Sequence, residues 1–332
     1  MRLLPAAAMA VALTVVDVGP RGRVVAEAQP STAQDAAPRG PADPVVLVVV
    51  DGVRWQEIFD GPGSRVAATR MPNLHRLATE RGAAIGGADG PAISASGPNF
   101  VSLPSYREIF SGRSGDDCTD NECPRIARPT IVDELHARGR PVAVFASWEK
   151  IDLAAASRPE GLRISAGRGG APGDPWPGAG DFRRDRETSA LALRHLEEAR
   201  PDFLFLGLGE TDEYAHHGDY AGYVDALTTA DEILGELMAA LTRMGERGAR
   251  THVFVTTDHG RANGFRDHGG RFPESGRVWL VAAGPRISAR GAVPLSRALH
   301  LRDIAPTVRE IVALPRVGAG REAGAPIDAL LR

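Results

Sequence analysis

The chain has 332 residues, of which 43% are hydrophobic and 24% are charged, the balance of a globular protein that can bury a substantial core. Its formal net charge of −3 gives no basic footprint, so we expect no binding of duplex nucleic acid. The acidic residues are concentrated in a few short segments of the chain. Such local clusters suit the binding of individual cations better than a negative charge spread over the whole surface.

The first 28 residues have the pattern of a secretory signal peptide. Arg2 precedes an apolar run over residues 3–16, and Ala26-Glu27-Ala28 offers a small-x-small cleavage site. Two arginines lie between the run and that site, so a disordered tail or a misassigned start is the alternative. The run is too short to span a bilayer, and we expect no stable membrane span in the mature chain. These features predict a periplasmic or secreted protein.

Residues 29–43 are rich in alanine, proline and polar side chains, which predicts a disordered tether. Beyond it, apolar runs rich in β-branched residues alternate with segments of helical periodicity. The runs fit strands buried on both faces of a parallel sheet. Expected strands lie in residues 44–52, 140–147, 201–212, 251–260 and 276–284, and expected helices in 72–81, 129–138, 187–199, 220–245 and 299–313. The alternation predicts a single α/β domain over residues 44–332, with the Gly/Pro-rich stretch 165–182 as a surface loop.

Carboxylates and imidazoles follow three of the expected strands. Asp51 follows the first, and Asp212 with His216 and Asp258 with His259 follow two later ones. Ligands bind beyond the carboxyl ends of the strands in open α/β sheets, so we expect these side chains to meet at one edge. Mixed carboxylate and imidazole ligation favours zinc, manganese or iron over calcium or magnesium. Capping of the next helix is the alternative for each Asp, but capping requires no histidine.

The segment VSLPSYREIFSG (101–112) predicts a short helix that begins just after Ser102, because Pro104 suits a first helical turn. Free amides and the helix dipole favour an anion at such a position. Ser102 could therefore act as a metal-activated nucleophile toward phosphorus. The alternative is that Ser102 only caps the helix.

The chain has only two cysteines, Cys118 and Cys123. Export would favour a disulfide between them, closing a small loop. A zinc half-site is the alternative, but no second cysteine pair or nearby histidine would complete it.

Taken in order, five segments resemble the motifs of the alkaline phosphatase superfamily, and especially its nucleotide pyrophosphatase/phosphodiesterase-like branch. They are VVVDGVRWQEIF, SLPSYREIFSG, ETDEYAHHGDY, VTTDHGR and LRDIAPTVREIVALP, within residues 44–315. The resemblance implies an alkaline-phosphatase-like three-layer αβα sandwich with a mostly parallel central sheet, compact and without a large cap domain. It also implies a secreted hydrolase of phosphate mono- or diesters that forms a phosphoserine on Ser102, with a small phosphorylated molecule as substrate.

The resemblance further implies two divalent metal ions, which we expect to be zinc, with manganese or iron as alternatives. One ion would be held by Asp51, Ser102, Asp258 and His259, and the other by Asp212, His216 and one further histidine. We expect His268 rather than His300 in that place, because compact members lack the insertion that otherwise separates this histidine from the Asp-His pair. The family also places a polar side chain against the phosphate, a role that falls on Asn121.

Sulfatase is the nearest alternative function, since Ser102-Leu103-Pro104-Ser105 begins like the sulfatase signature. Tyr106 stands where that signature has Arg, Asp51 lacks a second Asp beside it, and Asp258-His259 replaces Asp-Asn-His. A phosphotransferase or mutase of the superfamily would pass the phosphoryl group to an alcohol instead of water. From another class, the chain could be a non-catalytic metal- or ligand-binding protein on this scaffold.

Overall fold

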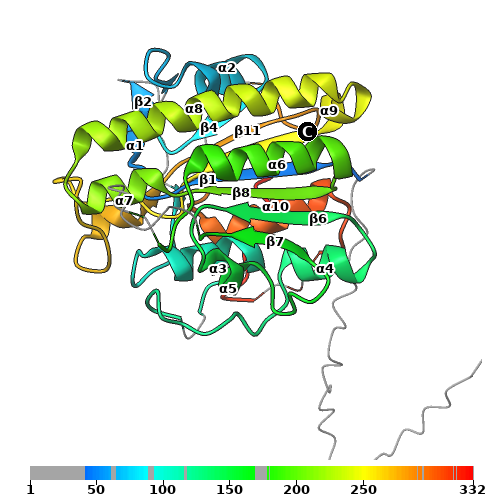
Figure 1. Cartoon of the computed structure of the whole chain (residues 1–332), viewed down its shortest axis with the longest axis horizontal. Coiled ribbons are helices and arrows are strands. Elements are labelled where there is room, and N and C mark those ends of the chain that lie inside the picture. Colours follow the sequence, from blue (N-terminus) through cyan, green and yellow to red (C-terminus); the bar gives the residue numbers. More distant parts are fainter. Residues whose placement is uncertain are drawn as a thin grey trace, which may run out of the picture. The chain divides into compact units, whose positions relative to one another are not determined.

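The computed structural model describes residues 42–60, 65–88, 93–115, 118–168, 178, 180–289, 291–293, 295–316, 318 and 320–331. The predicted signal peptide (1–28) and all but the last two residues of the predicted tether (29–43) lie outside the described residues, so both stay predictions. The described residues belong to one compact unit around an eight-stranded sheet of order β12-β4-β11-β9-β1-β8-β6-β7. Figure 1 shows helices on both faces of this sheet.

The central strands run parallel and are buried on both faces. Five consecutive strands of the sheet pair in parallel: β1 (Val45–Val50), β6 (Val142–Ala146), β7 (Arg163–Ala166), β8 (Phe203–Leu208) and β9 (His252–Thr256). β1 lies between β8 and β9, and every residue of these three strands is buried. Such strands need a continuous apolar sequence, because neither face meets water. The predicted strands in 44–52, 140–147, 201–212 and 251–260 are confirmed, and β7 is an additional edge strand.

The remaining strands are short. They are β2 (Phe59–Asp60), β3 (Arg65–Val66), β4 (Gly82–Ile85), β5 (Ile93–Ser94), β10 (Arg277–Val278), β11 (Leu280–Ala283), β12 (Gly291–Ala292) and β13 (Leu299–His300). The single strand expected in 276–284 is therefore wrong in detail. β10 pairs with β5 in a small sheet, whereas β11 joins the main sheet antiparallel to β9 and β4. Trp279 lies between β10 and β11, where the chain passes from the small sheet to the main sheet. Its indole N–H donates to the Val53 carbonyl at 3.1 Å and fixes this segment.

Four of the five expected helices are confirmed. The helices are α1 (Trp55–Ile58), α2 (Pro72–Glu80), α3 (Ser102–Ser111), α4 (Ile131–Ala137), α5 (Ile151–Ala155), α6 (Asp185–Ala199), α7 (Glu210–His216), α8 (Tyr220–Arg243), α9 (Glu246–Arg250) and α10 (Ile304–Ile311), with 3-10 turns η1 (Pro273–Gly276) and η2 (Leu301–Asp303). The helix expected in 299–313 starts only at Ile304. Leu299 and His300 instead form β13 and pair with β5, so their backbone is extended and not helical.

The sheet separates two apolar layers. Alternate residues of β1 point to opposite faces: Val46 and Val48 pack in one core with α2, α6 and α8, and Leu47 packs in the other with α3, α4 and α10. Figure 1 shows α6 and α8 on one side of the sheet and α3, α4, α5 and α10 on the other. The predicted three-layer α/β fold with a mostly parallel sheet is confirmed.

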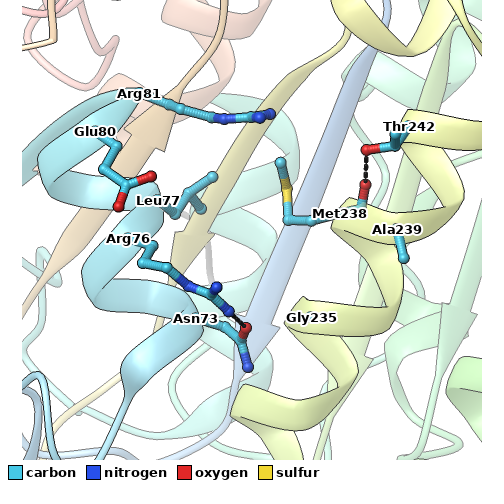
Figure 2. Close-up of a pocket in the computed structure, with 9 residues that line it drawn as sticks. All are labelled: Asn73, Arg76, Leu77, Glu80, Arg81, Gly235, Met238, Ala239 and Thr242. Atoms are coloured by element: carbon cyan, nitrogen blue, oxygen red, sulfur yellow. Dashed lines mark hydrogen bonds between the residues drawn. The ribbon is translucent and has the colours of Figure 1, made fainter.

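Three further features complete the fold. The loop predicted over 165–182 begins as the end of β7, and residues 169–177 and 179 lie outside the described residues. A pocket of about 210 Å³ lies between α2 and α8, where Figure 2 shows Arg76 bonded to Asn73. None of the described helices combines the length and apolar character that crossing a bilayer would require.

Candidate metal centre

Three adjacent strands bring the predicted ligands to one edge of the sheet. Asp51 directly follows β1, whereas β8 leads through Gly209 into α7, which carries Asp212 and His216 one turn apart. Asp258 and His259 follow β9. Because β1 lies between β8 and β9 and runs parallel to both, the three carboxyl ends are neighbours. The sequence pattern therefore places these side chains in one cluster.

A first group consists of Asp51, Asp258 and His259, whose ligand atoms all lie within 4.8 Å of one another. Nε2 of His259 is 3.5 Å from Oδ1 of Asp51 and 3.5 Å from Oδ2 of Asp258. Both of these carboxylate oxygens are buried and have no hydrogen-bond partner among the described residues. A buried carboxylate oxygen without a donor is costly, and a cation held between them would remove that cost. The group therefore fits a divalent metal ion.

The other polar atom of each residue in this group is bonded so that the free atom faces inward. Oδ2 of Asp51 accepts from the Tyr106 hydroxyl at 3.0 Å, and Oδ1 of Asp258 accepts from the Gly52 amide at 3.1 Å. Nδ1 of His259 donates to the Gly260 carbonyl at 2.9 Å, which leaves Nε2 with its lone pair. Such partners fix the orientation of metal ligands and the tautomer of a ligand histidine.

Burial and mutual repulsion shift the proton affinities of the first group. Burial raises the pKa of Asp51 well above its usual range, and the charges of Asp258 and Asp212 raise it further. Burial and the Asp212 charge raise the pKa of Asp258 to about 7. Burial lowers the pKa of His259 to about 4, so its imidazole is neutral near neutral pH. A bound cation would stabilise the carboxylates in their charged form.

A second group consists of Asp212, His216 and His268. Nε2 of His216 lies 3.0 Å from Oδ2 of Asp212 and 3.1 Å from Nε2 of His268. Nδ1 of His268 donates to the Phe100 carbonyl at 2.9 Å, so its Nε2 is again the free atom. The short loop after β9 thus returns His268 to the site. His300, in contrast, lies in β13, where its Nδ1 is 3.1 Å from the Ser94 hydroxyl.

Arg261 is a site residue that sequence reasoning missed. Its side chain is completely buried and its Nη1 contacts Oδ1 of Asp212. The rest of the guanidinium donates to the carbonyls of Phe265 and Arg266, inside the loop that carries His268. Burial alone would raise the pKa of Asp212, but Arg261 and His216 outweigh it and hold that pKa well below its usual range. A single arginine after an Asp-His-Gly turn has no periodicity or motif that would reveal this contact.

Ser102 is the first residue of α3 rather than the residue before it. The N-cap is Val101, and no N-cap side chain caps the helix, so the structure does not use Ser102 as a cap. Its hydroxyl oxygen instead lies 3.2 Å from Nε2 of His259, beside the first group. Both side chains are buried. The hydroxyl therefore points to the place where a cation would lie.

Asn121 is held at the start of α3. Its side-chain oxygen accepts from the Leu103 amide at 2.9 Å, and Lys150 donates to its backbone carbonyl at 2.9 Å. The predicted disulfide between Cys118 and Cys123 is present and closes the loop that carries Asn121. Because Leu103 is bonded to Asn121 and Pro104 has no amide hydrogen, two of the first three residues of α3 cannot donate to an anion, which corrects the expectation of several free amides.

The structure thus brings together all seven predicted ligand positions, and metal binding by them stays a prediction. They are Asp51, Ser102, Asp212, His216, Asp258, His259 and His268. Residues 182–316, which include the last five, match the family model described as the Metalloenzyme superfamily.

Curated relatives match only part of the chain. The 2,3-bisphosphoglycerate-independent phosphoglycerate mutase of Rippkaea orientalis is 30% identical over 138 residues, 38% of this chain and 24% of that protein. The corresponding mutase of Moorella thermoacetica is 31% identical over 127 residues, again 38% of this chain and 23% of that protein. The matched region therefore spans about a quarter of the length of these relatives.

Solved structures match most of the chain at low identity. A phosphonate monoester hydrolase of Agrobacterium radiobacter has a TM-score of 0.59 at 16% identity, covering 87% of this chain and 77% of that chain. Murine ectonucleotide pyrophosphatase/phosphodiesterase 5 in complex with AMP has a TM-score of 0.59 at 12% identity, covering 83% and 97%. A 2-O GAG sulfatase has a TM-score of 0.61 at 13% identity, covering 88% and 74%. At these identities the likeness shows the fold.

Proposed function

We propose that this chain is a member of the alkaline phosphatase superfamily and that it hydrolyses phosphate mono- or diesters through a phosphoserine intermediate on Ser102. The observation that carries the proposal is the position of the Ser102 hydroxyl, 3.2 Å from His259 in a buried group of two carboxylates and one neutral imidazole. Capping does not account for this placement, since α3 is capped neither by Ser102 nor by Val101.

The ligands would be divided between two ions as the superfamily motifs imply. Asp51, Asp258, His259 and Ser102 would hold the first, and Asp212, His216 and His268 the second. Two divalent ions would supply positive charge for the attacking and leaving oxygens and favour ionisation of the serine hydroxyl. We propose zinc, since imidazole and carboxylate ligands suit it, with manganese or iron as alternatives.

The chain's own residues would act in two displacement steps. Oγ of Ser102 forms a bond to phosphorus while the bond from phosphorus to the leaving oxygen breaks, and that oxygen takes up a proton. Water then attacks the phosphoserine, releases phosphate or a phosphomonoester, and restores the serine hydroxyl. Asn121 would donate its side-chain NH₂ to a phosphate oxygen, because its carbonyl oxygen is already bonded to Leu103.

One assay panel tests this proposal. Purified protein with added zinc or manganese is given p-nitrophenyl phosphate, bis(p-nitrophenyl) phosphate and p-nitrophenyl sulfate in parallel. We expect turnover of a phosphate ester well above that of the sulfate. Sulfate hydrolysis far above both phosphates would instead identify a sulfatase, and about two ions per chain without any turnover would favour a non-catalytic metal-binding protein.

Two features of the site argue against the sulfatase alternative. Tyr106, where the sulfatase signature has Arg, donates a hydrogen bond from its hydroxyl to Asp51 of the first group. Gly52 has a φ of +64°, and a Cβ there would overlap the side chains of Asp212 and Arg261. A second aspartate directly after Asp51 would therefore not fit this site.

Phosphoryl transfer to an alcohol is a second candidate, since the matched relatives are named as mutases. The phosphoserine would then pass its phosphoryl group to a hydroxyl group instead of to water. Incubation with 3-phosphoglycerate separates the two candidates. Formation of 2-phosphoglycerate would support a mutase, and release of inorganic phosphate alone would support a hydrolase.

We propose that the protein is exported to a periplasmic or extracellular location after cleavage before Gln29. The Cys118–Cys123 disulfide supports this, because disulfides persist in oxidising compartments. The intact mass of protein recovered from the periplasm of an expressing bacterium checks the cleavage site. Protein that remains in the cytoplasm with its first 28 residues attached would contradict the proposal.

A further inference from the structure

We propose that the two metal sites differ in affinity because Arg261 already neutralises the second one. The first site, formed by Asp51, Asp258 and His259, would keep its ion, whereas the second would fill and empty with the free metal concentration. This inference rests on the proposed two-metal function, but it concerns how the ions are held and not what they catalyse.

The first site carries two negative charges when its carboxylates are ionised, and neither carboxylate is paired with a Lys or Arg side chain in the described part of the chain. Among the described residues, the ion-pair contacts of Asp51 and Asp258 are with His259 alone. Oδ1 of Asp51 and Oδ2 of Asp258 are buried and without hydrogen bonds. A divalent ion placed there would meet two carboxylate oxygens that have no hydrogen-bond donor, and the attraction is strong because the surroundings are poorly polarisable.

The second site has a single carboxylate, and that carboxylate is already paired. Oδ1 of Asp212 contacts Nη1 of Arg261, and Oδ2 lies 3.0 Å from Nε2 of His216. The formal charges of Asp212 and Arg261 cancel. A divalent ion at this site would share the carboxylate with a guanidinium, and the two like charges repel each other.

Arg261 is held in place by more than its contact with Asp212. Its side chain is fully buried, and its guanidinium also donates to the carbonyls of Phe265 and Arg266. A guanidinium does not lose its proton in proteins, so the positive charge persists at every working pH. The repulsion is therefore a permanent property of the site.

The difference in solvent exposure between the two sites also favours tighter binding at the first. The side chains of Asp51, Asp258 and His259 are 3%, 0% and 0% exposed, whereas that of His216 is 43% exposed. An ion bound by His216 would therefore be open to water and to chelators, and an ion in the first site would be enclosed by protein.

Metal release from the zinc-loaded protein tests the inequality. The full chain is equilibrated with chelators of increasing strength, and zinc per chain is measured by mass spectrometry. We expect release in two separate steps. His216→Gln should abolish the weaker step and leave the tighter one. Release of both ions in one step, or loss of the tighter step in His216→Gln, would overturn the proposal.

A matched pair of variants isolates the charge of Arg261. Arg261→Lys and Arg261→Met both lose the forked bonds to Phe265 and Arg266, but only the first keeps a positive charge. We expect Arg261→Met to bind the second zinc ion at least about tenfold more tightly than Arg261→Lys. Equal affinities of the two variants for the second zinc ion would overturn the proposed role of the charge. Loss of the second ion from both variants would also overturn it and would show that Arg261 is a positioning residue.

These measurements use no substrate, so they can be separated from the proposed function. A chain with two unequal sites and no esterase activity would contradict the proposed function alone. An active enzyme with two equal sites would contradict this inference alone.

Discussion

The imidazole rings of His259 and His268 stack with their centroids 3.9 Å apart and their planes at 13°. Each ring belongs to a different predicted metal site, so the two sites are directly adjacent. Nδ1 of each ring donates to a backbone carbonyl, that of Gly260 or Phe100. The two Nε2 atoms would therefore be placed to bind two adjacent ions, the arrangement that suits an in-line displacement between two metals.

Replacement of Ser102 by alanine tests the nucleophile. We expect turnover of phosphate esters to fall by about a thousandfold or more, because no phosphoserine can form. Metal content should stay near that of the wild type, since Asp51, Asp258 and His259 remain. Ser105→Ala, on the same helix, is the matched control and should keep most of its activity. A Ser102→Ala protein with normal turnover would rule out the serine mechanism.

Replacement of Asn121 separates its two roles. Asn121→Asp keeps an oxygen for the Leu103 amide, 2.9 Å away in the wild type, but replaces the NH₂ donor with a negative oxygen. We expect its stability to be nearly unchanged and its kcat/KM to fall by about tenfold or more, since a phosphate would meet a like charge.

Asn121→Ala loses both roles and provides the comparison. It should also lower the free energy of unfolding by about 1 kcal/mol, the usual cost of a lost helix cap. Urea denaturation and steady-state kinetics on both variants check this. If Asn121→Asp keeps wild-type kcat/KM, Asn121 does not contact the phosphate.

Replacement of Tyr106 by phenylalanine tests whether the Tyr106 hydroxyl strengthens metal binding at the first site. The hydroxyl donates to Oδ2 of Asp51 at 3.0 Å, and its loss should weaken the first zinc ion by about 10- to 100-fold. Zinc competition titration measures this. Tyr223→Phe is the control, because its hydroxyl contacts Arg54 and Glu57 and not a predicted ligand. Unchanged zinc affinity in Tyr106→Phe would show that Asp51 needs no such support.

We expect protonation of His252, which lies far from the site, to lower the free energy of unfolding in acid. His252 is buried at the start of β9, and its Nε2 accepts from the Arg286 amide at 3.1 Å, which requires a neutral ring. Burial lowers its pKa from 6.5 to about 4. The unfolded chain therefore binds the proton more readily, so this contribution is intact above pH 6.5 and is lost as pH falls toward 4.

The expected loss is on the order of 3 kcal/mol across that window. Urea denaturation between pH 7 and pH 4.5 measures it, with His252→Gln as the comparison that lacks the titrating ring. The wild type should lose more stability than His252→Gln over this range. Parallel pH profiles for the two proteins would show that His252 makes no such contribution.

The strands that carry the candidate site could be predicted because they are central. β1, β8 and β9 are buried on both faces, so their sequences are continuous apolar runs with polar residues directly after them. The rule that ligands lie beyond the carboxyl ends of parallel strands then placed Asp51, Asp212 and Asp258 together. The edge strands β7 and β12, and β4 beside β12, are short and have no comparable run, so the sequence did not predict them.

The local sequence specifies which chemical groups reach the sheet edge, since residue type and strand position are local properties of the chain. What each group contacts there depends instead on how distant segments pack together. This packing pairs Arg261 with Asp212 and Tyr106 with Asp51, and it directs Ser102 toward His259. These partners are 49, 55 and 157 residues apart, and nothing in the local sequence of one indicates the other. The packing of the loops over the sheet brings them together and sets the charge around each site.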